Sequence, residues 1–145
     1  MPNRFYDTRG DICRQLSPWE MAKADLPPRK AHFQLEEPLR FRSDIADGDI
    51  IVPRGYISDL ASIPRFAWSI FMSPDDPRIA LGAWIHDLLY QQHGMIAVDG
   101  VHPTMMSREQ ADKILCYEAM PDLGATKLQQ HTVYWMLRIF GDRWK

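Results

Sequence analysis

In the N-terminal half of the chain, apolar and polar positions alternate over two short runs, residues 33–35 and 39–41. A period of two residues is typical of a strand with one buried face. Pro38 lies between the runs, so it either marks an edge strand or divides the segment in two. An Asp-Gly turn signal at residues 47–48 is followed by a second strand-like run, 49–52. The pattern predicts a β-hairpin or a small antiparallel sheet.

Helices are predicted in the C-terminal half, where apolar positions recur at spacings of three and four residues. The first helix opens at the Asp-Pro cap signal of residues 73–77 and runs to about residue 92, with Gly94 as its stop. The second opens at the capping box of residues 107–110 and ends before Pro121.

A third helix opens at a similar capping box, residues 126–129, and ends near Gly141. One face of this helix carries Leu128, Thr132, Trp135, Met136 and Ile139.

These elements predict a single α+β domain over residues 1–145. Residues 1–30 are rich in proline and show little periodicity, so we expect an irregular N-terminal arm. Residues 32–65 supply the strands and a central loop, whose apolar content predicts that it packs against the core. Residues 73–144 supply a C-terminal three-helix bundle.

The composition is that of one packed domain. Hydrophobic residues make up 46% and charged residues 25% of the 145 residues, and the formal net charge is -2. This charge supplies no basic field for nucleic acid, and no window approaches the roughly 18 apolar residues of a membrane span. The first residues lack the apolar stretch of a signal peptide, and Cys13 and Cys116 make no disulfide framework. We expect a soluble protein of a reducing cytoplasm.

The candidate chemistry centres on the first predicted helix. One inward-facing stripe of this helix carries Ile79, Ala83, His86 and Tyr90. Asp87 borders the stripe. Burying an imidazole or a carboxylate costs several kcal/mol unless the group is paired, so this placement favours a functional His-Asp site. The alternative is a core histidine bonded to a backbone carbonyl, with Asp87 at the surface.

Asp112 on the second predicted helix is the candidate partner of His86, and two interpretations of it stay open. Arg108 lies four residues earlier and can pair with Asp112 in an ordinary helix salt bridge. Alternatively, Asp112 reaches across the helix pair to orient the His86 ring and fix its tautomer, as a carboxylate does for a general base.

Asp59 and Ser62 are the polar residues of the otherwise apolar central loop. Asp59 can complete a metal site with Asp87, since carboxylates and backbone carbonyls suit a hard cation such as calcium. Alternatively, Asp59 and Ser62 bond loop amides and hold the loop in place. The remaining histidines show no zinc-ligand spacing.

Three sequence blocks resemble an uncharacterised-domain family of phages and prophages. They are VPxGYxSDxASIPR at residues 52–65, HDxxY at 86–90 and SRxxAD at 107–112. The resemblance covers roughly residues 33–144. It implies a phage-related origin and brings no established activity.

A second, local similarity concerns secreted phospholipases of the A-two type. HDLLY at residues 86–90 is similar to their helix motif His-Asp-x-Cys-Tyr, and residues 111–117 resemble their second-helix segment. The chain departs from them at residues 66–70, where a Gly-rich calcium loop is missing, and it lacks their disulfide network. A calcium site therefore depends on the loop around Gly55 and Asp59.

This similarity implies that His86 activates a water, that Asp87 binds calcium, and that Asp112 with Tyr90 orients the histidine. We therefore expect a metal-assisted hydrolase of a phage or prophage, acting on an ester of a lipid or of the cell envelope. It would act in the cytoplasm of the bacterial host or in the virion.

Two alternatives remain. The polar residues can instead form a buried structural network in a non-enzymatic virion or tail-assembly component, with phage structural proteins as partners. Last comes a phosphohydrolase of the His-Asp superfamily. That superfamily is all-helical and needs an upstream helical histidine, whereas the upstream His32 lies in a strand pattern.

Overall fold

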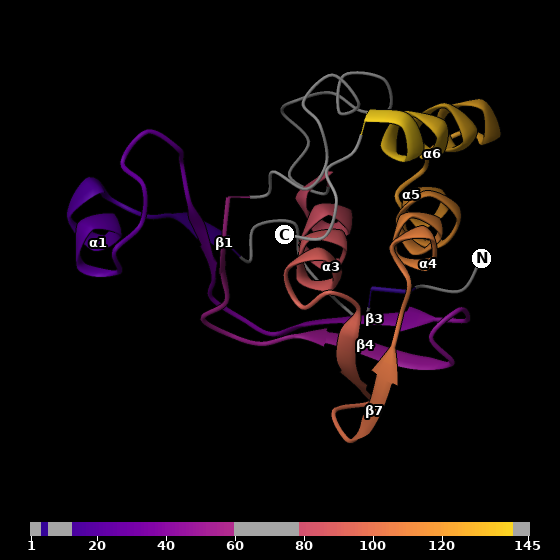
Figure 1. Ribbon diagram of the computed structural model, residues 1–145, viewed down its shortest axis with the longest axis horizontal. Helices are drawn as coiled ribbons and strands as arrows, with labels where there is room; N and C mark the ends of the chain where they lie inside the picture. The colour runs from indigo at the N-terminus through magenta and orange to yellow at the C-terminus, as the bar shows by residue number, and fades with distance from the viewer. Residues whose placement is uncertain (1–3, 6–12, 60–78, 141–145) are drawn as a thin grey trace.

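The computed structural model describes residues 4–5, 13–59 and 79–140, and it shows the expected α+β architecture (Figure 1). The strands are β1 (Cys13–Gln15), β2 (Phe33–Leu35), β3 (Leu39–Ser43), β4 (Gly48–Val52), β5 (Ile57–Ser58), β6 (Met95–Val98) and β7 (His102–Met105). The helices are α1 (Pro18–Lys23), α3 (Ile79–Gln91), α4 (Arg108–Lys113), the π-helix η1 (Ile114–Ala119), α5 (Met120–Asp122) and α6 (Lys127–Phe140).

The described strands form three small antiparallel sheets, ordered β1-β2-β5, β3-β4 and β6-β7. Pro38 divides the predicted first strand into β2 and β3. Along β3 the buried positions are Leu39, Phe41 and Ser43, as the period of two predicts. The β3-β4 hairpin is the predicted one, with Leu39 opposite Val52.

The prediction of an irregular arm over residues 1–30 was wrong, because this segment contains β1 and α1. The start of α1 is a capping box in which Ser17 and Glu20 each bond the other's backbone N–H, with Pro18 at the first helical position. The Ser-Pro-x-Glu signal was present in the sequence. At six residues, α1 is too short for an apolar period to reveal it.

Two further corrections concern the predicted bundle. The hairpin β6-β7 lies between the first two helices, where no strand was expected. The second helix also continues through Pro121 as η1 and α5. There the Met120 N–H bonds the Leu115 carbonyl, five residues back. Pro121 stands in the first turn of α5, where a missing N–H costs little.

Helix α3 forms the centre of the structure. Residues 81–90 are all buried, so the helix is covered on every side and not along one stripe alone. It packs against β4 on one side and against α4 and η1 on another. Its end at Gly94 is as predicted, with the Gly94 N–H bonded to the Leu89 carbonyl.

Helix α6 packs against α4 and η1 through Val133, Tyr134 and Leu137. The apolar face with Leu128, Trp135 and Ile139 is therefore the outer face of α6. None of the helices in the described ranges is long and apolar enough to cross a membrane.

Candidate functional site

His86 and Asp112 meet at the interface of α3 and α4, both completely buried. His86 Nε2 lies 2.8 Å from Asp112 Oδ1, within the expected hydrogen-bonding distance. The Tyr90 hydroxyl, one helical turn after His86, donates to the same oxygen at 2.7 Å. The His86 and Tyr90 rings also lie against each other, with centroids 4.2 Å apart. The sequence thus predicted this three-residue contact correctly.

The carboxylate of Asp112 also binds a residue that the sequence did not single out. Arg138 of α6 donates to Asp112 Oδ2 at 3.0 Å. The salt-bridge partner that Asp112 has in the structure is therefore Arg138, whereas the sequence suggested Arg108. Arg108 interacts with the Tyr90 hydroxyl instead. Arg138 lies 26 residues from Asp112, and no local pattern signals a contact at that distance.

The electrostatics of this site determine the protonation of Asp112 and Tyr90. Burial acts to raise the pKa of the Asp112 carboxyl, but His86, Tyr90 and Arg138 outweigh it, and the pKa lies below its ordinary value. Burial together with the Asp112 charge raises the pKa of the Tyr90 hydroxyl. Asp112 is thus an ionised acceptor and Tyr90 a neutral donor. An ionised acceptor at Nε2 requires that Nε2 of His86 carry a proton.

Asp87 is the neighbour of His86 on α3 and lies in a second polar cluster. Its Oδ2 accepts hydrogen bonds from the Ser58 hydroxyl of β5 and, at 2.8 Å, from Gln91 Nε2. Gln91 in turn accepts from the Tyr56 hydroxyl at 2.5 Å. Asp87 Oδ1 is buried and has no hydrogen-bond partner within the described structure. The alternative interpretation that placed Asp87 at the surface is wrong, because Asp87 is completely buried.

Asp59 follows β5 directly, and its Oδ2 lies 3.9 Å from Lys30 Nζ. The described residues contain no cluster of three acidic, histidine or cysteine side chains that could hold a metal ion. The metal role of Asp87 and Asp59 thus stays a prediction. Ser62, most of the central loop and the predicted start of the first helix lie outside the described residues.

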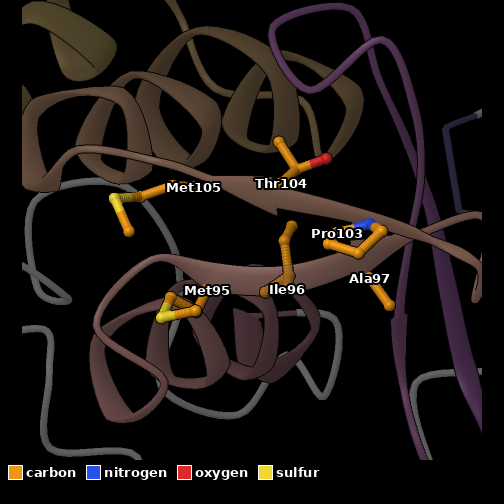
Figure 2. Close-up of a pocket in the computed structure, with 6 residues that line it drawn as sticks. All are labelled: Met95, Ile96, Ala97, Pro103, Thr104 and Met105. Carbon is orange, nitrogen blue, oxygen red and sulfur yellow. The ribbon is translucent and has the colours of Figure 1, made fainter.

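A shallow apolar hollow lies away from this network, on the β6-β7 hairpin (Figure 2). Its volume is about 390 Å³, and it is lined by Met95, Ile96, Ala97, Pro103, Thr104 and Met105. None of these side chains titrates, so the hollow offers no acid-base chemistry. The chemistry of the described residues is concentrated at the α3-α4 interface.

The fold and this interface define an α+β protein with a buried His-Asp-Tyr network between two helices. The chain belongs to a family described as a protein of unknown function (DUF1353), whose model matches residues 33–137. This match includes both the His86 and the Asp112 segments. No curated protein and no solved structure was found to match the chain.

Proposed function

We propose that this protein is a hydrolase of ester bonds in which His86 is the general base. The observation that carries the proposal is the 2.8 Å contact between His86 Nε2 and Asp112 Oδ1. A carboxylate at this nitrogen selects the tautomer whose Nδ1 can accept a proton, and it stabilises the imidazolium that then forms.

In the proposed reaction, Nδ1 of His86 takes a proton from a water molecule as the water oxygen attacks the ester carbonyl. The tetrahedral intermediate then collapses, the bond to the leaving alcohol breaks, and His86 returns the proton to the alcohol oxygen. Asp112 stays ionised throughout, because its pKa is held below the ordinary value despite its burial. Tyr90 holds the shared Asp112 oxygen in place at 2.7 Å.

Calcium at Asp87 is the second part of the proposal. Asp87 Oδ1 is a buried carboxylate oxygen without a hydrogen-bond partner among the described residues, and such an atom suits a hard cation. Asp59 would supply a further oxygen from the segment after β5. A bound calcium ion would polarise the ester carbonyl.

The substrate class and the source also belong to the proposal. The local similarity of residues 86–90 and 111–117 to secreted phospholipases supports an ester of a lipid or of the cell envelope. The three motif blocks support a phage or prophage origin.

A structural network is the second candidate function, and one observation favours it. His86 and Asp112 are completely buried, and both oxygens of Asp112 are bonded. A fully satisfied polar network can be retained because it specifies one packing arrangement. The protein would then be a virion or tail-assembly component.

The test compares His86→Asn with His86→Ala. The wild-type protein is assayed against short-chain esters and phospholipid vesicles, with thermal unfolding measured in parallel. For an enzyme, His86→Asn should remain folded and lose about a hundredfold to ten-thousandfold in rate.

For a structural part, both variants should lose about 1 to 3 kcal/mol of stability, and phage yield should follow the melting temperature across the series. Wild-type protein without activity on any ester, together with yield that tracks stability alone, would remove the hydrolase proposal.

A further inference from the structure

The outer face of α6 carries an apolar stripe directly opposite its packing face. Leu128, Trp135 and Ile139 are 77%, 60% and 67% exposed. At about 100° per residue, these three positions lie within a narrow sector, and Thr132 lies at its edge. Val133 and Leu137 lie on the far side of the helix and are buried. The helix is thus apolar on two faces, of which the core uses one.

The stripe has the spacing of a helix-helix seam. The intervals from Leu128 to Thr132, Trp135 and Ile139 are four, three and four residues, as at alternate core positions of a coiled coil. We propose that this face binds a second copy of the chain, with the two α6 helices packed antiparallel.

Antiparallel packing makes the stripe complementary to itself. Leu128 of one chain meets Ile139 of the other, and Thr132 meets Trp135, so the bulky indole lies opposite a small side chain. A two-fold axis then passes between Thr132 and Trp135, and each contact occurs twice, as a closed dimer requires.

The charges along α6 agree with this orientation. From Leu128 to Leu137 the helix has no Lys, Arg, Asp or Glu, so no formal charge lies beside the seam. Lys127 would lie beside the C-terminal turn of the partner helix, where a cation is favoured. Arg138 does not oppose Lys127 there, because it is turned inward to Asp112.

The area is also sufficient for a modest dimer. From their exposed fractions, the three side chains offer roughly 450 Å² of apolar surface per chain. A stable interface takes about 800 Å² per partner, of which a little over half is apolar. The stripe therefore supplies the apolar part, and the flanking Met136 and Lys127 contribute to the rim. We expect a dissociation constant of the order of 10 µM.

The experiment uses the full chain in sedimentation equilibrium from about 1 to about 200 µM. The wild-type protein should move from monomer to dimer across this range. Leu128→Glu and Ile139→Lys should each raise the dissociation constant more than about tenfold, because each places a charge against an apolar side chain. A mixture of the two variants should restore dimers, since antiparallel packing brings the new Glu beside the new Lys. Circular dichroism checks that both variants are folded.

Met105→Glu is the matched control, since Met105 is equally exposed but lies on the β6-β7 hairpin. It should leave the dissociation constant unchanged. A wild-type protein that stays monomeric overturns the proposal, and so do variants that fail to complement each other. Monomeric wild-type protein that sediments with phosphatidylcholine vesicles, and loses this with Leu128→Glu, would assign the face to a lipid surface instead.

Discussion

Asp112 is the charged residue on which the polar contacts of the described site converge. Its two oxygens accept from His86, Tyr90 and Arg138, which come from two other helices. A buried carboxylate is costly without partners, so these three donors make its charge tolerable. Because these contacts form in the folded protein, the ionised Asp112 contributes to the free energy of unfolding.

Asp112→Asn should therefore destabilise the protein and weaken the dependence of its stability on pH in the acid range. Because the pKa of Asp112 is lowered on folding, its stabilising effect is complete above its ordinary value of 3.8 and is lost as the pH falls below it. We expect a loss of about 3 kcal/mol at pH 7 and a weaker pH dependence below pH 4, measured by urea unfolding.

Tyr90→Phe is the comparison variant, since it removes one hydrogen bond to Asp112 but keeps the carboxylate. It should lose about 1 to 2 kcal/mol and keep a steeper pH dependence below pH 4 than Asp112→Asn, because His86 and Arg138 still lower the pKa of Asp112. Equal slopes for Asp112→Asn and the wild type would show that Asp112 is not an ionised partner in the folded protein.

Only part of the site could be predicted residue by residue. Helical spacing placed His86 and Tyr90 on one stripe, and the neighbouring helix supplied Asp112. The partners Arg138 and Ser58 lie 26 and 29 residues away from the aspartates they bind. Contacts at such separations are set by how the elements pack, which no local pattern reports.

Among the elements, η1 connects the site to the β3-β4 hairpin. Its Glu118 is buried and accepts from the Ser43 hydroxyl at 2.6 Å and from the Asp44 N–H at 2.7 Å. Arg4 Nη1 completes the arrangement at 3.2 Å. Because η1 continues α4, this carboxylate ties the helix that carries Asp112 to the β3-β4 hairpin.

Glu118→Ala should lose about 3 kcal/mol of stability, because it leaves a buried hydroxyl and a backbone N–H without their acceptor. Glu109→Ala on the same continuous helix is the matched control. Its carboxylate pairs with Lys113 at the surface, so its loss should change stability far less. Chemical denaturation measures both variants, and equal losses would contradict a structural role for Glu118.

Gly94 joins the end of α3 to β6 and has a positive φ of 79°. A Cβ at this position would lie 1.8 Å from the Met106 carbonyl oxygen, whose residue bonds back to Gly94 through its N–H. Gly94→Ala should therefore lower the stability for two reasons: alanine is strained at a positive φ, and the backbone must move to make room for the Cβ.

Gly124→Ala separates these two costs. Gly124 also has a positive φ, 94°, but a Cβ there meets nothing within 4 Å. It should lose about 1 kcal/mol by thermal unfolding, and Gly94→Ala roughly 2 kcal/mol more. Equal losses of stability in the two variants would show that the backbone between α3 and β6 can shift to admit the Cβ without a cost in free energy.

Sequence patterns predicted the elements that have a clear period or cap. The β3-β4 hairpin and α6 follow from alternation and from the box at Thr126 and Gln129. The hairpin β6-β7 was missed because its sequence does not alternate: Met95–Val98 is apolar at every position, although only Val98 of the eight strand residues is buried. The continuation past Pro121 was missed because proline was expected to end the helix. In η1 the backbone hydrogen bonds span five residues instead of four, and Pro121 then stands in the first turn of α5.

At the scale of the whole molecule, α3 lies at the centre with His86 and Asp87 pointing to two different clusters. His86 joins α3 to α4 and, through Asp112, to α6. Asp87 joins α3 to β5 through Ser58. One helix thus connects the C-terminal helices to the N-terminal sheet, and a ligand bound at either cluster should stabilise the entire fold.

Calcium binding at Asp87 should therefore be visible in global unfolding. A ligand at a hundred times its dissociation constant adds about 2.7 kcal/mol, which corresponds to a rise of roughly 5 to 10 °C in melting temperature at this chain length. We expect calcium to raise the melting temperature relative to a chelator. Asp87→Asn should abolish that rise, and Asp59→Asn should reduce it if Asp59 supplies a second oxygen.

Asp25→Asn is the control, because Asp25 is exposed and its left-handed backbone, with φ 58°, accommodates Asn. Identical melting curves with calcium and with chelator would remove the metal from the proposed mechanism, while the His86-Asp112 pair would remain open to the rate measurements on His86→Asn.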